Sequence, residues 1–394
     1  MQSSLDPFGI PGKNDYSTEA KQARLEFIAA KTSQNFQSIP ASNLRSEDMK
    51  GRIENFIGAI QIPLGLAGPL QFKGKEAQGM IYGPFATTEG ALVASACRGS
   101  KLLTASGGVT TRVISQSLHR APSFMCANLD QAIRLKDFIL QQRENLSQML
   151  RDISRYTKLV DIDPFLNGRT LHCILHFETG DAAGQNMVTV AGDHLGRWIF
   201  EQANIQANIE IKSYHVEGGM NGDKKVNFYS FIKGRGIRVA AEAFVNDACF
   251  AQQFKMSAAS FYEHYLRGAA ASTLAGSIGL NVNIANVLGA MFVATGQDVG
   301  SVHESSIGYL HIEREGHGLY CCLTLPSLLI GTVGGGTSLP TQKEALDMIS
   351  CYGPGKKVRL AEIMAGFCLA LDLSTWSSIA NQTFTASHMT LGRP

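Results

Sequence analysis

Three charged residues, widely separated in the chain, are of the types that polarise a carbonyl group and deliver a proton to it. Lys224, in the triplet Asp223-Lys224-Lys225, could place an ammonium group at a developing oxyanion. Asp298 follows an apolar segment, residues 287–294, where an unpaired carboxylate would be poorly solvated. Glu89 could complete a cluster with this pair, because two carboxylates beside one lysine raise the pKa of one of them and make Glu89 a proton donor.

Each of these residues also has an ordinary structural explanation. A triplet such as Asp223-Lys224-Lys225 usually forms a solvated turn, and Glu89 could simply stabilise a helix dipole. His388, near the C-terminus, would by itself be an exposed tail residue, although the near-neutral pKa of histidine suits a proton donor. Residue type and position leave both interpretations open.

The segment around Glu89 is predicted to form a helix with a face of small residues. Thr87 or Thr88 can cap its first turn, which would contain Glu89. Gly107-Gly108 can end the helix, because glycine adopts the left-handed conformation of a helix C-terminus. Alanine and glycine along this helix would let another backbone segment approach closely.

A small domain is predicted between two parts of a larger one. Residues 122–217 follow the order β-α-β-β-α-β, which is ferredoxin-like. The expected strands cover 124–129, 158–162, 170–179 and 207–216, and the expected helices run from Asp130, as the cap, to about Leu150 and over 187–203. His172 and His176 are predicted to be surface residues rather than metal ligands, because four residues of a strand span ~13 Å.

We therefore expect an α+β fold with an inserted domain. The large mixed α/β domain would comprise residues 51–121 and 218–394, with a long central helix over about 357–380. The small ferredoxin-like (βαββαβ) domain would comprise residues 122–217, and residues 1–50 would form an N-terminal helical segment whose helix, over 18–32, is capped by Ser17.

The segment Gly180–Met187 could bind a pyrophosphate group. It links a predicted strand to a helix N-terminus, where backbone amides attract anions and glycine permits close approach. An ordinary strand-to-helix turn would explain the same residues. The glycine-rich stretch Gly331–Thr337 has neither GxGxxG nor P-loop spacing.

Composition argues against several classes of protein. The chain has 35 basic and 33 acidic residues, a net charge of +2, so charge predicts no nucleic-acid or membrane partner. Its eight cysteines lack CxxC or Cys/His spacing, which argues against a metal site or disulfide framework and favours a reducing, cytoplasmic compartment. The sequence has no 18-residue apolar run and no signal peptide, so we expect a soluble protein without a membrane anchor.

The stretch Pro84–Gly90, followed by Ala94-Ser95-x-x-Arg98-Gly99, resembles the signature segment of the hydroxymethylglutaryl-CoA (HMG-CoA) reductase family. The resemblance, to the soluble catalytic part of class I-like members, extends from about Asn43 to Arg393. Glu54–Gly58, with the segment after it, is similar to the family's dimer-contact segment. The resemblance implies a homodimer, or a dimer of dimers, with the active site at the subunit interface.

The resemblance also implies roles for individual residues. Lys224 would stabilise the oxyanion, Glu89 would donate a proton, and Asp298 would complete their cluster. His388, on a C-terminal flap, would protonate the leaving CoA thiolate. The implied substrate-binding residues are Arg98, Arg120, Glu217, Asp223, Lys225, Arg267 and Asn286. The implied NADPH-binding residues are Ser154 and Arg155, at the 2′-phosphate, with Asp181, Ala182, Gly184, Gln185, Asn186, Met187, Gly334 and Gly335.

The acyl pocket departs from the family pattern, whereas the reductive residues match it. Glu217 stands where the family has serine, and Gly219 where it has asparagine. The family's substrate lysine falls at Leu266 or Arg267, and Arg267 could compensate for its loss. Asn283 replaces a histidine, and residues 299–302 replace a turn that contains glutamine and asparagine.

We expect an NADPH-dependent reductase that converts an acyl-CoA thioester to a primary alcohol with two NADPH, by default HMG-CoA to mevalonate. The same chemistry on another acyl thioester, such as one without a distal carboxylate, is the first alternative. A non-catalytic CoA- or nucleotide-binding homologue is the second, and the joint presence of Glu89, Lys224, Asp298 and His388 argues against it.

Overall fold

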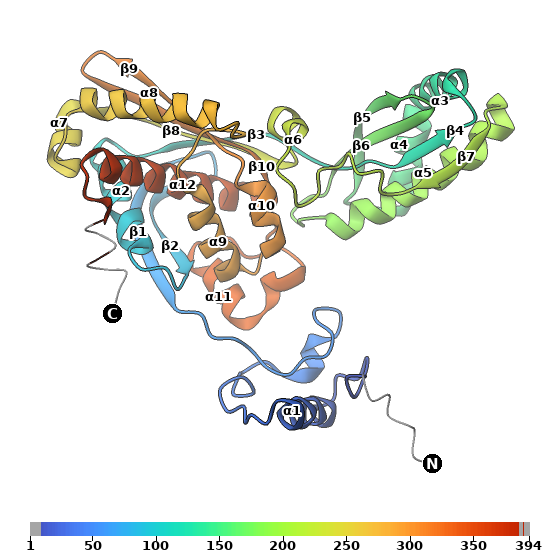
Figure 1. Cartoon of the computed structure of the whole chain (residues 1–394), viewed down its shortest axis with the longest axis horizontal. Helices are drawn as coiled ribbons and strands as arrows, with labels where there is room; N and C mark the ends of the chain where they lie inside the picture. The colour runs from blue at the N-terminus through green and yellow to red at the C-terminus, as the bar shows by residue number, and fades with distance from the viewer. Residues whose placement is uncertain (1–8, 386–388, 390–394) are drawn as a thin grey trace. The chain divides into compact units, whose positions relative to one another are not determined.

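The computed structural model of the chain describes residues 9–385 and 389 (Figure 1). The chain divides between Pro63 and Leu64 into two compact units. In the first unit, α1 (Thr18–Thr32) begins after Ser17, whose Oγ accepts a hydrogen bond from the Ala20 amide over 3.1 Å, as predicted. Buried Arg24 donates to the carbonyl oxygens of Pro11 and Phe56, so one side chain holds the surrounding loops together.

The second unit contains a hairpin and an eight-stranded antiparallel sheet. The hairpin pairs β1 (Leu64–Lys73) with β2 (Gln78–Ala86). The order in the sheet is β7-β4-β6-β3-β8-β10-β9, with β5 beside β6. Its strands are β3 (Thr110–Arg120), β4 (Ser123–Cys126), β5 (Lys158–Asn167), β6 (Thr170–Glu178), β7 (Ile211–His215), β8 (Gly236–Asn246), β9 (Tyr309–Glu315) and β10 (Gly318–Leu328).

The long central helix of this unit, α12 (Lys357–Ala380), lies at the predicted position. The others are α2 (Leu92–Ala105), α3 (Leu129–Gln141), α4 (Arg143–Ile153), α5 (Gln185–Ala207), α6 (Phe228–Lys233), α7 (Asp247–Cys249), α8 (Ala258–Leu274), α9 (Ile284–Thr295), α10 (Val302–Ser305) and α11 (Pro340–Met348). By length and composition α12 could cross a membrane, but it is almost wholly buried against α2, α8, α9 and β8. It is therefore the core helix of the unit.

The crossing of α2 and α12 explains the small residues of α2. A Cβ atom on Gly99 would lie 1.8 Å from the carbonyl oxygen of Ala370, so the two helix backbones are in contact there. Gly107 and Gly108 both have positive φ and end α2 as predicted.

The predicted start of α2 is wrong. The helix begins at Leu92, after Ala91 in the left-handed conformation (φ 69°). Thr87 Oγ1 instead accepts the amide of Glu89 over 3.0 Å, a local turn that competes with helix capping. Glu89 therefore lies on the segment that precedes the helix.

The region between β3 and α6 has the predicted order of strands, with its strands arranged β7-β4-β6-β5. Its first helix differs from prediction, since it is divided into α3 and α4 at Gln142 and is capped by Asn128 rather than Asp130. The inward residues of β6 are fully buried, as their alternation predicted: Leu171, Cys173, Leu175 and Phe177. The boundaries proposed for a separate domain remain a prediction, because residues from Leu64 onward form one compact unit.

His176 is buried, so its predicted surface position is wrong. Its ring bonds Ser117 Oγ over 3.0 Å and Tyr229 OH over 2.9 Å, where β3, β6 and α6 meet. Burial lowers the pKa of His176 despite the nearby carboxylate of Asp163. Alternation alone missed this because both faces of β6 are covered near its end.

Candidate active site

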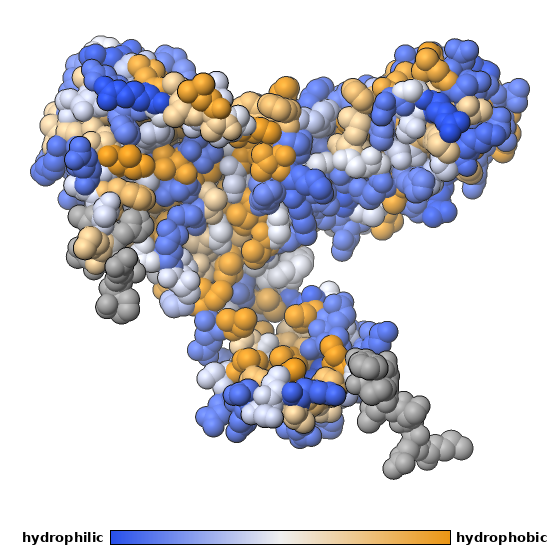
Figure 2. All heavy atoms as spheres, in the orientation of Figure 1, coloured by the Kyte–Doolittle hydropathy of each residue, from blue (hydrophilic) through white to orange (hydrophobic). Residues whose placement is uncertain are grey.

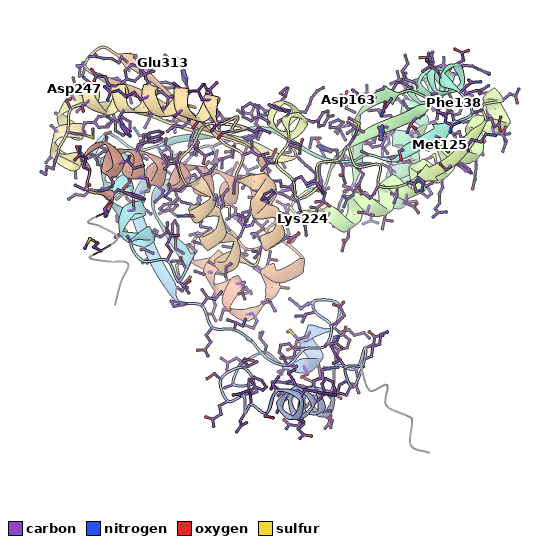
Figure 3. All side chains as sticks on the ribbon, in the orientation of Figure 1. Met125, Phe138, Asp163, Lys224, Asp247 and Glu313 are labelled. Carbon is purple, nitrogen blue, oxygen red and sulfur yellow. The ribbon has the colours of Figure 1, made fainter. Side chains whose placement is uncertain are left out.

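Lys224 lies on the loop between β7 and α6, and its ammonium nitrogen is 2.9 Å from Asp298 Oδ2 (Figure 3). The hydrogen bond from this ammonium to Asp298 raises the pKa of Lys224, so its charged form is favoured. The backbone of Lys224 has positive φ (54°), and its amide donates to Glu304 Oε1 over 3.2 Å. The lysine is therefore fixed through both its backbone and its side chain.

Glu89 does not join this pair within one chain. Its carboxylate accepts a hydrogen bond from Asn286 Nδ2 over 2.9 Å, at the start of α9, whereas Asp298 follows the end of α9. The helix rises 1.5 Å per residue, so its part from Asn286 to Thr295 is about 14 Å long. Among these described residues, the predicted Glu89–Lys224–Asp298 cluster is thus split into two half-sites at opposite ends of a helix.

The half-site around Glu89 borders a cavity of about 430 Å³. Its wall includes Arg98, whose Nε donates to Ser374 Oγ over 3.0 Å and whose guanidinium lies over the Phe254 ring. Burial lowers the pKa of Arg98. The cavity thus presents a half-buried cation whose contacts to α12 are neutral hydroxyl and carbonyl groups, which suits an anionic part of a ligand.

The half-site around Lys224 borders a second, more polar cavity of about 550 Å³. It is lined by Arg120, Thr189, Glu217, Gly219, Asn221, Asp223, Lys224 and Lys225. The predicted substrate residues Arg120, Glu217, Asp223 and Lys225 are therefore brought together here. In contrast, Arg267, on α8, is not among the described residues that line either cavity. Its exposed side chain pairs with Glu263 at 3.7 Å, and its role as a replacement for the lysine remains a prediction.

Every nitrogen of the Arg120 guanidinium already has an acceptor. Nε donates to Thr189 Oγ1 over 2.9 Å, and Nη2 to the backbone carbonyl of Gln185 over 3.2 Å. Nη1 lies 2.9 Å from Glu217 Oε1 and 3.1 Å from Asp223 Oδ2. This arginine is nearly inaccessible to water and is bound on all sides by the protein itself.

A buried ion pair that was not predicted lies behind this cavity. Arg235 Nη1 donates to Glu304 Oε2 over 2.6 Å, and both side chains are fully buried. Arg235 Nη2 donates to Gln185 Oε1 over 2.7 Å and lies 3.3 Å from Asp223. The sequence signal was an arginine between two glycines, but a charge in a loop gives no indication that it will be buried.

The charges of this network shift the ionisation of its acids. Burial raises the pKa of Glu304, although the guanidinium of Arg235 opposes the effect. For Asp223 burial also acts upward, but Arg235, Arg120 and the amide of Gln185 outweigh it and leave the pKa below its ordinary value. Asp223 is thus held as a carboxylate beside Lys224.

The start of α5 fits the pyrophosphate of a dinucleotide. Gly184 has φ 88°, and a Cβ atom there would lie 2.4 Å from Thr179, so this turn requires glycine. Within residues 9–385 no side chain caps the amides at the first turn of this 23-residue helix, where Asn186 and Met187 lie. Free amides and the helix dipole attract an anion.

Two of the predicted cofactor-binding residues use their side chains for contacts inside the protein. Asp181 accepts the amides of Gly355 and Lys357 at the start of α12, over 2.9 and 3.3 Å. Gln185 binds Arg235 and donates to Asp223 over 2.8 Å. Sequence pattern could not show this, because the partners come from distant parts of the chain.

The other predicted cofactor residues lie as follows. Val333, in the loop with Gly334 and Gly335, bridges to Ala182, so this loop borders the segment before α5. Ser154 ends α4, where its Oγ accepts the amide of Thr157 over 3.0 Å, and Arg155 beside it is exposed. His388 lies outside the described residues.

Comparison with known proteins supplies an independent line of support. A family model described as hydroxymethylglutaryl-coenzyme A reductase matches residues 20–393. The 3-hydroxy-3-methylglutaryl-coenzyme A reductase of Methanocaldococcus jannaschii is 40% identical over 377 residues, which cover 95% of this chain and 93% of the relative. That of Pyrococcus abyssi is 38% identical over 396 residues, which cover 98% and 94%.

The fold is also similar to a solved structure. The class II 3-hydroxy-3-methylglutaryl-CoA reductase from Streptococcus pneumoniae, bound to NADPH, aligns with a TM-score of 0.66 over 91% of this chain and 96% of that chain. Sequence identity in this alignment is 17%, so the comparison concerns the fold.

Proposed function

Because the chain belongs to the hydroxymethylglutaryl-coenzyme A reductase family, we propose that it reduces HMG-CoA to mevalonate with two equivalents of NADPH. The observation that carries the proposal is the Lys224–Asp298 pair at the edge of a polar cavity. A charged ammonium group at that position stabilises the negative charge that develops on the thioester oxygen. Asp298 favours the charged form of Lys224 and holds its ammonium group at the edge of the cavity.

NADPH would be held at the first turn of α5, with its pyrophosphate on the free amides and its 2′-phosphate near Ser154 and Arg155. When bound, it supplies the hydride for each reduction. The cap that Asp181 forms on α12 and the contacts of Gln185 with Arg235 keep this turn in place. His388 would protonate the CoA thiolate as it leaves.

The active enzyme would be a homodimer, or a dimer of dimers, in which Glu89 of one protomer meets Lys224 of its partner. The split of the two half-sites along α9 supports this arrangement. The hairpin β1–β2 offers an apolar surface for such an interface, because Leu64, Leu66, Met80 and Tyr82 are about half exposed. Figure 2 shows hydrophobic residues among the hydrophilic ones on the surface of the unit that begins at Leu64.

We also propose that the enzyme works in the cytoplasm. All eight cysteines are free thiols, and several are buried close to apolar side chains. Free thiols at this number suit a reducing compartment.

A second candidate function is the same reduction on an acyl-CoA without a distal carboxylate. It is favoured by Arg120, whose guanidinium is already bound by Glu217 and Asp223. A non-catalytic homologue would bind CoA esters or nucleotide without turnover.

The test is to follow NADPH absorbance with purified protein and HMG-CoA and to count NADPH oxidised per thiol released. We expect a ratio of about two, and a loss of about a hundred- to a thousandfold in kcat for Lys224→Ala, the range for removal of an oxyanion donor. Oxidation of NADPH with an acyl-CoA that lacks a distal carboxylate, and not with HMG-CoA, would establish the second candidate function. Absence of turnover with every thioester would refute both.

A further inference from the structure

Glu217 supplies a carboxylate to Arg120 at the cavity that Lys224 also borders. Its Oε1 is 2.9 Å from Arg120 Nη1, and its Oε2 accepts a hydrogen bond from Asn221. The side chain borders the same cavity as Lys224 and is 42% exposed, so it faces the space that receives the acyl group. The protein thus supplies its own carboxylate to Arg120.

The carboxylates that contact the two guanidinium groups around this position outnumber them. Two buried guanidinium groups, of Arg120 and Arg235, face three carboxylates, those of Glu217, Asp223 and Glu304. Of the two lysines at this cavity, Lys224 is paired with Asp298, and Lys225 donates to the backbone carbonyl of Asp223 over 3.2 Å. An incoming carboxylate would be the fourth acid beside two arginines.

We propose that Glu217 takes up one proton when an acyl-CoA with a free carboxylate binds beside Lys224. This inference rests on the proposed function. The proton comes from the solvent and forms an O–H bond on the Glu217 carboxylate. The neutral carboxyl group releases Arg120 Nη1 to the acyl carboxylate, toward which it can also donate a hydrogen bond. The proton on Glu217 and the acyl carboxylate enter the cavity together, so their charges cancel. The phosphates of the CoA portion add their own charge separately.

The surroundings of Glu217 favour this response. Burial raises the pKa of Glu217, and so does Asp223, while Arg120 and Arg235 oppose them. When an acyl carboxylate binds Arg120, Glu217 loses its contact with that guanidinium and gains a negative charge beside it. Both changes raise the pKa of Glu217 further. Lys224 and Lys225 also border the cavity. Lys224 is paired with Asp298, whereas Lys225 contacts a neutral carbonyl and keeps a charge that opposes the rise.

The experiment is titration calorimetry of HMG-CoA into the wild-type protein without NADPH, at pH 7, in two buffers of different ionisation enthalpy. We expect uptake of up to one proton per site, and a Kd that rises up to about tenfold per pH unit above the pKa of Glu217. An HMG-CoA amide, in which the distal carboxylate is replaced by a carboxamide, should bind without proton uptake.

Glu217→Gln is the matched variant, because it keeps the shape of the side chain but does not titrate. We expect it to bind HMG-CoA about tenfold more tightly at pH 7.5, without proton uptake, and Glu217→Ser should behave in the same way. No uptake by the wild type, equal uptake by Glu217→Gln, or equal uptake with the amide would each overturn the inference. Binding of HMG-CoA only after substitution of Glu217 would also overturn it and show exclusion instead.

Turnover separates this inference from the proposed function. Proton-linked binding of HMG-CoA without NADPH oxidation would refute the proposed reaction and leave the role of Glu217 supported. Reduction of HMG-CoA with no proton uptake on binding would refute the role of Glu217 alone.

Discussion

Lys357 Nζ donates a hydrogen bond to the carbonyl oxygen of Ala182 over 2.9 Å, which fastens the start of α12 to the segment before α5. The same ammonium donates to the carbonyl oxygen of Gly180 over 3.1 Å, and burial lowers the pKa of Lys357 to about 8. Asp181, between these two residues, caps α12 in return. Each segment thus fixes the other.

Lys357→Met should therefore weaken cofactor binding. Loss of two hydrogen bonds from an ammonium group, about 1.5 kcal/mol or more, predicts a rise of about tenfold in the KM for NADPH. The KM for HMG-CoA should change less, because Gly180 and Ala182, which Lys357 contacts, line neither of the cavities around Glu89 and Lys224. Lys356→Met, at the exposed neighbour, is the control. Equal increases in both KM values would show general loss of structure instead.

Mixed dimers test the split active site. If Glu89 acts with Lys224 of the partner, a dimer of one Glu89→Gln protomer and one Lys224→Ala protomer retains one intact site of two. Random mixing of the two inactive variants should then restore about a quarter of wild-type activity, since half of the dimers are mixed. No recovery, with exchange of protomers verified by mass-tagged subunits, would place both residues of a site in one chain.

Gly99→Ala should be strongly destabilising. The added methyl group would overlap the carbonyl oxygen of Ala370, and separating α2 from α12 disturbs the packed centre of the unit. We expect a loss of about 3 kcal/mol in the free energy of unfolding, measured in urea. Gly289→Ala, in α9, is the control, because a Cβ atom there meets open space among the described residues. It should be neutral or stabilise by up to about 1 kcal/mol.

The buried carboxyl group of Asp372 should make the stability of the folded protein depend on pH. Burial raises the pKa of this carboxyl to about 7, although it accepts the amides of Val282 and Asn283 at the start of α9. The folded chain keeps this proton up to about pH 7, whereas the unfolded chain releases it near the ordinary pKa of 3.8. The contribution of Asp372 to the free energy of unfolding therefore falls as pH rises, by roughly 3 kcal/mol between pH 5 and pH 7.5.

The comparison with Asp372→Asn isolates this effect, because asparagine does not titrate. The stability of the wild type minus that of the variant, from urea unfolding across this pH range, should decrease toward high pH. A difference that stays constant from pH 5 to pH 7.5 would mean that Asp372 is ionised throughout.

The sequence by itself determined the features that depend on local order along the chain. Ser17 and the stretch after it predicted α1, and strict alternation predicted the buried face of β6; the long helix α12 also lies where the sequence placed it. Such features follow from backbone chemistry and side-chain period, which are written in neighbouring residues. The family resemblance predicted roles for Glu89 and Lys224 in the same way, through the short motifs around them.

Only the tertiary structure decided which charges meet. It paired Lys224 with Asp298, left Glu89 at the other end of α9, and placed Glu217 against Arg120. Burial of Arg235 with Glu304 and the use of Asp181 as a cap for α12 were equally invisible in the sequence. Coulomb attraction and desolvation depend on distance and burial in space, and residues far apart in the chain carry no local mark of either.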